Sequence, residues 1–140
     1  FIQRGLKIIF ALKTRIYYQD TDAGGVIYHS RYLDFLERAR ADWLRYLGFE
    51  SGKLAKEFNV LLVVRKLSID FHQPGRLDDE LDISVDTVKV GRAQLTLTQS
   101  VCRSGLILAS ANVNLACIHS LKFAPIRFPY SLKDRLEPYV

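Results

Sequence analysis

The chain has 140 residues, 49% hydrophobic and 25% charged, which is typical of one folded domain with a hydrophobic core and excludes a disordered segment. No apolar run reaches the roughly 18 residues that a membrane-spanning helix needs. The net charge of +5 and the pI of about 9.3 suit a phosphorylated small molecule as partner, whereas no dense block of lysine and arginine indicates nucleic-acid binding.

The first part of the chain predicts a strand followed by a long helix. Residues 1–11 form a lead-in to which we assign no role, and the Ile- and Tyr-rich segment Leu6–Tyr18 predicts a strand. Residues 19–27 form a loop. Apolar residues then recur at three- and four-residue spacing, which predicts a helix over Ser30–Leu47 with a broad apolar face. Gly48 marks its end.

The rest of the chain changes to the two-residue period of strands. Ser51–Phe58 predicts a second short helix, and Ser131 is expected to cap a last helix that ends at Leu136. Between these helices, strands are predicted over Val60–Phe71, Leu81–Thr87, Leu95–Val101 and Ala109–Cys117, with turns at Pro74-Gly75, near Gly91 and at Ser104-Gly105.

This order predicts an α+β fold, in which one antiparallel sheet wraps around the long helix and buries one face against it. We expect residues 1–140 to form a single domain. Cys102 and Cys117 are expected to be free thiols, because a hairpin at Ser104-Gly105 would leave them about ten residues, or about 30 Å, out of register. Free thiols indicate a reducing compartment, and we expect a cytoplasmic protein.

The stretch DTDAGGVIYHSRY, residues 20–32, concentrates polar residues ahead of the long helix. One interpretation is structural: Asp20 and Asp22 form turns and caps, while Gly24 and Gly25 supply positive φ angles. A calcium loop is disfavoured because Arg31 stands where the closing glutamate would be.

Other site types have less support in the sequence. The three histidines, His29, His72 and His119, are far apart and have no paired cysteines nearby, so no metal site is expected. No Gly-x-Ser-x-Gly motif is present for a serine nucleophile. The two cysteines fall in alternating strands, where buried inert thiols are the common case.

The second interpretation of residues 20–32 is an acyl-transfer site. The start of a helix offers unpaired N–H groups and the positive end of a dipole, which can hold a developing oxyanion. Gly24 and Gly25 allow the backbone to approach a bound substrate closely. A carboxylate can activate water or attack the carbonyl itself.

Three segments resemble a known family. YYQDTDAGGVIYHSRYLDFLERAR (17–40), VVRKLSIDFHQPGRLDDEL (63–81) and, more loosely, LKFAPIRFP (121–129) resemble the 4-hydroxybenzoyl-CoA thioesterase family of the hotdog fold. Within it they are most similar to the bacterial acyl-CoA thioesterases associated with the Tol-Pal system. The resemblance covers nearly all of the chain after the first dozen residues, which are longer than is usual in the family. It implies a curved antiparallel sheet around a central helix.

The resemblance also implies roles for individual residues in thioester hydrolysis. Asp22 matches the family's catalytic carboxylate. The backbone N–H of His29, with Tyr28 beside it, matches the group that holds the oxyanion. The His29 imidazole would orient water or the thioester, or else only form hydrogen bonds at the helix start. Asp20 and Tyr18 match the motif as structural support.

The substrate implied by the resemblance is an acyl-CoA, with coenzyme A as part of the substrate and no separate cofactor. Lys89 and Arg92 match positions that bind its phosphates in relatives, and Arg65 and Lys66 are further candidates, although solvated strand charges explain these two equally well. The resemblance implies a homo-oligomer in which two hotdog subunits join their sheets and share the site, commonly as a tetramer.

Two alternatives stay open. One is a dehydratase or hydratase on the same fold, although the chain has no histidine and acid placed as that reaction requires. The other is a non-catalytic protein that binds acyl thioesters or lipid-synthesis enzymes. Neither the acyl chain nor the choice between coenzyme A and an acyl carrier protein follows from the sequence.

Overall fold

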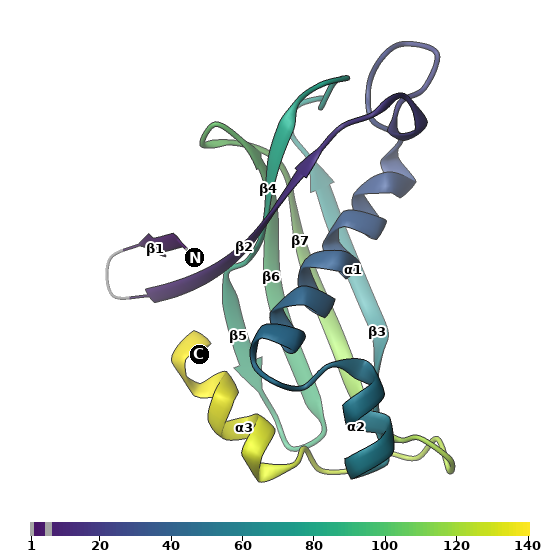
Figure 1. The fold of residues 1–140 in the computed structure, drawn as a ribbon, viewed down its shortest axis with the longest axis vertical. Coiled ribbons are helices and arrows are strands. Elements are labelled where there is room, and N and C mark those ends of the chain that lie inside the picture. Colours follow the sequence, from purple (N-terminus) through teal and green to yellow (C-terminus); the bar gives the residue numbers. More distant parts are fainter. Residues whose placement is uncertain (1, 5–6) are drawn as a thin grey trace.

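The computed structural model describes residues 2–4 and 7–140 and shows an antiparallel sheet with a long helix across one face (Figure 1). The strands are β1 (Ile2–Arg4), β2 (Lys7–Arg15), β3 (Val60–Phe71), β4 (Glu80–Val85), β5 (Thr87–Val90), β6 (Gln94–Arg103) and β7 (Leu106–His119). The helices are α1 (His29–Tyr46), α2 (Ser51–Phe58) and α3 (Tyr130–Leu136). The strand order is β1-β2-β4-β6-β7-β3, and β5 also pairs with β6. The expected α+β architecture is confirmed.

The broad apolar face of α1 packs against the sheet. Its large side chains, among them Phe35, Leu36 and Trp43, are almost completely buried in one cluster that also includes side chains of the strands and of α3. Gly48 follows α1 with a φ of +90°, a conformation that glycine adopts without steric cost, so the predicted end of the helix is confirmed.

A buried polar contact fixes the position of α1 on the sheet. The Arg40 guanidinium, only 8% exposed, donates a hydrogen bond to Gln99 Oε1 on β6 at 2.9 Å. Gln99 Nε2 donates to the carbonyl of Leu36 on α1 at 3.2 Å and to the carbonyl of Ser84 on β4 at 3.1 Å. Burial lowers the pKa of Arg40 from its ordinary value. One amide side chain therefore joins α1 to two strands.

A β-bulge in β3 changes which residues face α1. The register of β3 against β7 shifts between Val64 and Lys66. Before the bulge, Val60 and Leu62 pack toward the helices, and after it Leu67 packs against the core and Phe71 contacts α1. Because of the extra residue, the positions of β3 that face the helices are even-numbered before the bulge and odd-numbered after it.

The segment Leu6–Tyr18, predicted as one strand, corresponds to β2, which is shorter. Leu6 itself lies outside the described part. β2 ends at Arg15, and Tyr18–Asp20 form a short 3-10 helix. The chain turns because Ile16 exchanges backbone hydrogen bonds with Asp78 and Asp79 and because the Asp20 carboxylate accepts the N–H of Tyr17. Of the lead-in over residues 1–11, residues 1, 5 and 6 also lie outside the described part. In the rest of the lead-in, β1 pairs antiparallel with the start of β2.

Two further expectations about elements are wrong. The predicted strand Leu81–Thr87 is divided at Asp86, where the chain leaves β4 and continues as β5, paired with β6. Ser131 does not cap α3, because the helix begins at Tyr130 with Pro129 as its N-cap and without a side-chain cap.

The cysteines are both free and buried, as expected. Cys102 pairs in register with Ile107, and Cys117 lies ten residues farther along β7. Burial raises the pKa of the Cys117 thiol to about 11.

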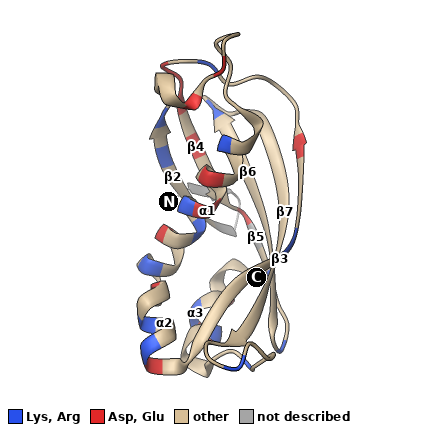
Figure 2. Ribbon diagram, turned by 90° about the vertical axis from the view of Figure 1, so that its right-hand side faces the viewer, with Lys and Arg blue, Asp and Glu red and all other residues tan. Residues whose placement is uncertain are grey.

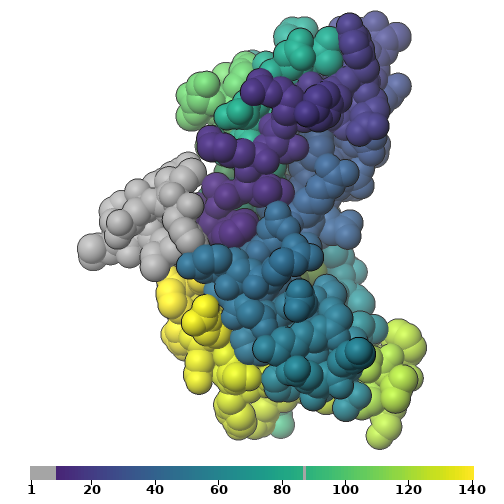
Figure 3. Space-filling view, viewed as in Figure 1, coloured from purple at the N-terminus to yellow at the C-terminus, as the bar shows by residue number. Residues whose placement is uncertain are grey.

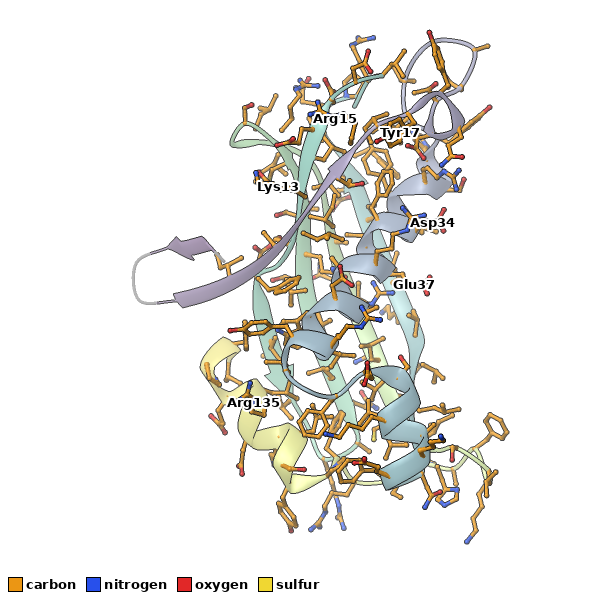
Figure 4. All side chains as sticks on the ribbon, viewed as in Figure 1. Lys13, Arg15, Tyr17, Asp34, Glu37 and Arg135 are labelled. Atoms are coloured by element: carbon orange, nitrogen blue, oxygen red, sulfur yellow. The ribbon has the colours of Figure 1, made fainter. Side chains whose placement is uncertain are left out.

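Among the described residues, no helix is long and apolar enough to cross a membrane. On the neighbouring strands β2 and β4, Lys13 and Arg15 form ion pairs with Asp82 and Glu80 (Figure 4 labels the two cations).

The contact between Arg40 and Gln99 predicts a stability effect. Replacing Gln99 by alanine leaves a buried guanidinium and two buried carbonyls without their partner, so we expect Gln99→Ala to lower the free energy of unfolding by about 2–4 kcal/mol. Urea unfolding followed by circular dichroism measures this. Gln94→Ala, an exposed position on the same strand, is the control and is expected to change stability by less than about 0.5 kcal/mol. Equal effects of the two changes would contradict this account.

Candidate active site

The loop between β2 and α1 folds back on itself and rests on the segment after β3. Thr21 pairs with Ile27, and Val26 pairs with Arg76. The Ile27 N–H donates to the carbonyl of Gly75 at 2.9 Å, and the Gly75 N–H donates to Tyr32 Oη at 3.2 Å. A Cβ atom at Gly75 would overlap the Ile27 side chain. The sequence predicted only a turn at Gly75 and did not indicate that this residue supports the loop before α1.

Asp22 holds this loop with one carboxylate oxygen. Oδ1 accepts the N–H of Gly24 at 2.8 Å and that of Val26 at 3.3 Å. No group in the described part of the chain donates to Oδ2, so that oxygen is available to water or a substrate. Gly24 is needed because a Cβ there would lie 3.3 Å from Asp22 Oδ1, and Gly25 has a φ of +79°.

Asp20 is fully engaged within the protein. It is buried, its Oδ1 lies 3.0 Å from Arg31 Nε, and its Oδ2 accepts the Tyr17 N–H at 2.9 Å. Its backbone carbonyl also accepts the N–H of Tyr28 at 3.0 Å. A carboxylate whose two oxygens are both occupied has a structural role, in agreement with the expectation for Asp20.

The N-terminus of α1 is left without a cap. Tyr28 is the N-cap residue, and its side chain makes no capping hydrogen bond. The N–H groups of His29 and Ser30 have no acceptor within the described residues, whereas the Arg31 N–H donates to the Tyr28 carbonyl. Free N–H groups and the positive end of the helix dipole attract negative charge on a ligand. Helix starts are usually capped by Ser, Thr, Asp or Asn, so this one is open to a substrate.

A hollow of about 230 Å³ opens beside the start of α1. The His29 ring lies in it, stacked on the Phe71 ring with 4.2 Å between centroids and a 14° angle between planes. The residues that line the hollow are Val26, Ile27, His29, Tyr32, Phe71, His72, Gln73 and Pro74. Asp22 is next to the hollow, because its carboxylate accepts the N–H of Val26, one of the lining residues. The exposed Tyr28 side chain is not among the lining residues.

The four basic residues expected to bind the phosphates of coenzyme A lie away from this hollow. Arg65 and Lys66 are exposed at the bulge in the middle of β3, where Arg65 Nε donates to Asn114 Oδ1 at 3.1 Å. Lys89 is exposed on β5. Arg92 lines a second hollow of about 380 Å³ between the turn after β5 and α3.

Two cations that sequence analysis missed share the hollow with Arg92. They are Arg127, whose guanidinium donates to Tyr130 Oη at 2.9 Å, and Lys133 on α3. The hollow has no acidic residue in its lining, and it therefore suits an anion. Figure 2 shows that lysine and arginine also lie on α2 and α3 at this end of the molecule.

The two hollows lie at opposite ends of the sheet. The turn at Ala93 bonds to Cys117, which pairs with Leu62 near the start of β3, whereas His29 stacks on Phe71 at the end of β3. Nine residues of strand separate Leu62 from Phe71, which corresponds to about 30 Å. Within one chain, Arg92 is therefore remote from Asp22.

The histidines do not gather with other metal-ligating side chains. His72 Nε2 lies 2.9 Å from Ser110 Oγ, and His119 Nδ1 accepts the N–H groups of Leu121 and Lys122. Throughout residues 2–4 and 7–140, no cluster of three or more His, Cys, Asp or Glu side chains offers a metal site.

Comparison with known proteins places the chain in a family. The family model of the thioesterase superfamily matches residues 24–109, a stretch that begins two residues after Asp22. The acyl-CoA thioesterase YbgC of Haemophilus influenzae is 41% identical over 124 residues, which cover 89% of this chain and 91% of that protein. The acyl-CoA thioester hydrolase YbgC of Escherichia coli O6:H1 is 38% identical over 125 residues, 89% of this chain and 92% of that protein.

A solved structure gives the same result. The crystal structure of a probable thioesterase from Bartonella henselae superposes with a TM-score of 0.82 at 34% identity, covering 87% of this chain and all of that chain. The arrangement of one long helix against a wrapped antiparallel sheet is the hotdog fold.

The close packing of Gly75 on Ile27 predicts that this glycine is required. We expect Gly75→Ala to lower the free energy of unfolding by about 1–3 kcal/mol, because the added methyl group must displace the buried Ile27 side chain. Thermal and urea unfolding measure the change. Gly52→Ala is the matched control: no atom lies within 4 Å of its Cβ position and it is within α2, so we expect unchanged or slightly higher stability. A Gly75→Ala protein as stable as the parent would contradict the packing argument.

Proposed function

We propose that this chain, which belongs to the thioesterase superfamily, hydrolyses an acyl-CoA thioester to a free acid and coenzyme A. The observation that carries this proposal is the uncapped start of α1 beside Asp22, a carboxylate with one oxygen unengaged. The names of the two YbgC relatives support acyl-CoA as the substrate class.

In the proposed mechanism, the thioester carbonyl oxygen accepts a hydrogen bond from the backbone N–H of His29. Negative charge develops on this oxygen as the carbonyl carbon becomes tetrahedral. The N–H group and the dipole of α1 stabilise that charge without any reorganisation of the protein. One such donor is typically worth about 3–4 kcal/mol of transition-state stabilisation.

Asp22 acts by one of two routes. As a general base, Oδ2 takes a proton from water while the water oxygen bonds to the carbonyl carbon, and the intermediate then expels the coenzyme A thiolate, which takes up a proton. As a nucleophile, Oδ2 bonds to the carbonyl carbon and expels the thiolate, and water then cleaves the mixed anhydride. After a single turnover in labelled water, solvent oxygen in the Asp22 carboxylate excludes the pure general-base route, because it enters there only when water attacks the Asp22 carboxyl carbon of the anhydride.

The side chains next to the oxyanion site have lesser proposed roles. The His29 imidazole, held by its stacking on Phe71, orients water or the thioester. The exposed Tyr28 lies at the rim of the site, and Gly24 and Gly25 let the substrate approach the loop backbone.

We propose that two subunits pair along β3. In the part of the chain that the structure describes, β3 ends the strand order, so its outer edge lacks a neighbouring strand. It carries exposed apolar side chains, including Val63, Val64 and Phe71. Unprotected edges of this kind are sites for pairing with another chain. Antiparallel pairing of two β3 strands about a two-fold axis brings the start of one strand beside the end of the other.

That pairing supports a site shared between subunits. The hollow with Arg92, Arg127 and Lys133 lies at the same end of the sheet as the start of β3, and the thioester site lies at the other end. In the dimer, the cations of one subunit approach the thioester site of the other and bind the phosphates of coenzyme A. Lys89, Arg65 and Lys66, which are exposed, add further positive charge to the surface of the assembly.

We also propose an assembly, a location and partners for the enzyme. Two such dimers form a tetramer. The buried free thiols suit a reducing compartment, and we propose a cytoplasmic location. The alternative acyl donor is an acyl carrier protein, and the alternative partners are lipid-synthesis enzymes.

The proposal predicts that Asp22→Asn abolishes most activity. Asparagine keeps the Oδ1 acceptor that holds the loop but cannot act as a base, so kcat/KM is expected to fall by about a hundred- to ten-thousand-fold. Free-thiol release from a panel of short, long and aromatic acyl-CoAs measures it. Asp42→Asn, an exposed carboxylate that pairs with Arg45 on α1, is the control and should retain full activity.

Two outcomes count against the catalytic proposal. One is a parent protein that cleaves no thioester of the panel, and the other is an Asp22→Asn protein that hydrolyses at the parent rate. The first result would favour the non-catalytic acyl-binding alternative over an enzyme, and the second would show that hydrolysis does not depend on the Asp22 carboxylate.

The basic hollow predicts a change in KM that depends on the substrate's nucleotide. We expect Arg92→Ala and Arg127→Ala each to raise the KM for acyl-CoA by about ten- to a hundredfold, with a small change in kcat, because a charge-assisted contact to phosphate is lost. The same acyl group on N-acetylcysteamine, which has no phosphates, should show no change. Lys53→Ala on α2 is the control. An equal loss with both thioesters would show that the hollow does not bind the nucleotide.

A further inference from the structure

The loop after β7, residues 120–125, holds two large apolar side chains out in solvent. Leu121 is 79% exposed and Phe123 is 68% exposed. Phe123 has a φ of +53°, a left-handed conformation that is rare for a bulky aromatic residue. Such strain is found mainly where the surrounding structure enforces it for function.

Hydrogen bonds fix this loop in place. His119 Nδ1 accepts the N–H groups of Leu121 and Lys122 at 3.2 Å each, and the His119 carbonyl accepts the Phe123 N–H at 2.9 Å. The Ser120 N–H donates to the Asn59 carbonyl at 2.8 Å, directly before β3. The two apolar side chains are therefore presented by an ordered loop, and no residue in the described part of their own chain covers them.

A second exposed apolar group lies at the other end of β3. Tyr17, Tyr18 and Tyr28 are all exposed around the start of α1, beside the thioester site (Figure 4 labels Tyr17). The loop is bonded next to the start of β3, and the tyrosines lie near its end, about 35 Å away along eleven residues of strand. Within one chain these groups do not meet.

Both groups project on the same side of the molecule. In Figure 1 the loop after β7 and the loop ahead of α1 extend past the free edge of β3, and Figure 3 shows the former standing out from the surface. A two-fold axis across β3 exchanges the two ends of the strand. It therefore carries the loop of one copy to the tyrosines of the other, twice in each dimer.

We propose that the loop 120–125 of one subunit covers the tyrosine rim of its partner's thioester site, with Phe123 and Leu121 packed against the partner's tyrosines. This inference rests on the proposed pairing along β3, and it names the segment that completes each site. Closing the rim with apolar side chains excludes water from the oxyanion region, which strengthens the hydrogen bond of the His29 N–H.

A second copy fits these observations better than a lipid surface. The patch on the loop consists of two apolar side chains with a single lysine between them, which is small for a membrane anchor. A partner's aromatic rim, by contrast, matches it in size and apolar character and lies where the symmetry requires it.

Disulfide cross-linking tests the contact without relying on activity. Chains carrying Phe123→Cys together with Tyr28→Cys, or with Tyr18→Cys, are oxidised mildly and run on a non-reducing gel. We expect a covalent dimer with at least one of the two pairs. Phe123→Cys with Leu106→Cys is the matched control, since Leu106 is exposed on the β6–β7 hairpin, away from the edge of β3, and should give no dimer. Absence of cross-linking in both tyrosine pairs, or equal cross-linking in the control, overturns the proposal.

Mixed dimers test whether the loop acts on the partner's site. We expect Phe123→Ser to lower kcat/KM at least tenfold while circular dichroism shows a folded protein. Asp22→Asn and Phe123→Ser chains, co-expressed with different tags and purified as the heterodimer, should regain about half the parent rate, because one of the two sites then has both parts intact.

The outcomes separate this inference from the proposed function. No recovery in the heterodimer, with Asp22→Asn inactive alone, overturns the loop's role and leaves the thioesterase proposal standing. A parent protein that cleaves no thioester removes the thioesterase proposal, and an Asp22→Asn protein with the parent rate removes the role of Asp22; in both cases the cross-link decides the contact. Binding to vesicles of anionic phospholipid that Phe123→Ser abolishes, without any cross-link, assigns the loop to a membrane and overturns the inference.

Discussion

The position of α1 on the sheet is the constraint on which the site depends. Its apolar face alone would permit sliding, since many buried side chains make similar contacts at neighbouring positions. Gln99 removes that freedom, because its amide bonds to the Leu36 carbonyl, the Ser84 carbonyl and the Arg40 guanidinium at once. A shift of α1 by one turn would leave these buried groups unpaired. The start of α1 is thereby fixed beside Phe71 and the loop that carries Asp22.

The two aspartates of the motif divide two tasks between them. Asp20 is buried and uses both oxygens on Arg31 and Tyr17, and it holds the turn from which the loop departs. Asp22 uses only one oxygen on the loop and leaves the other open. The turn interpretation and the catalytic interpretation of Asp22 are therefore compatible, because one carboxylate offers two separate acceptors.

The sequence predicted most elements because their periodicity is strong. The bounds of α1 were within one residue of those predicted, and those of α2 and β3 agreed with them. Local patterns could not show where hydrogen bonding to a distant loop ends a strand, as at Arg15. They gave no sign that Gln99 and Arg40 would be buried partners. Arg127 and Lys133 join Arg92 only through the packing of α3, which no local spacing reveals.

The bulge in β3 shows most clearly why the site was only partly predictable. The segment Val60–Phe71 begins with five apolar residues in succession, so its pattern does not indicate which positions face the helix. Without the extra residue near Arg65, the strand would turn Phe71 to the opposite face from Leu62, away from His29. The bulge therefore lets one strand pack its start against the core and still offer an aromatic ring to the imidazole at its end.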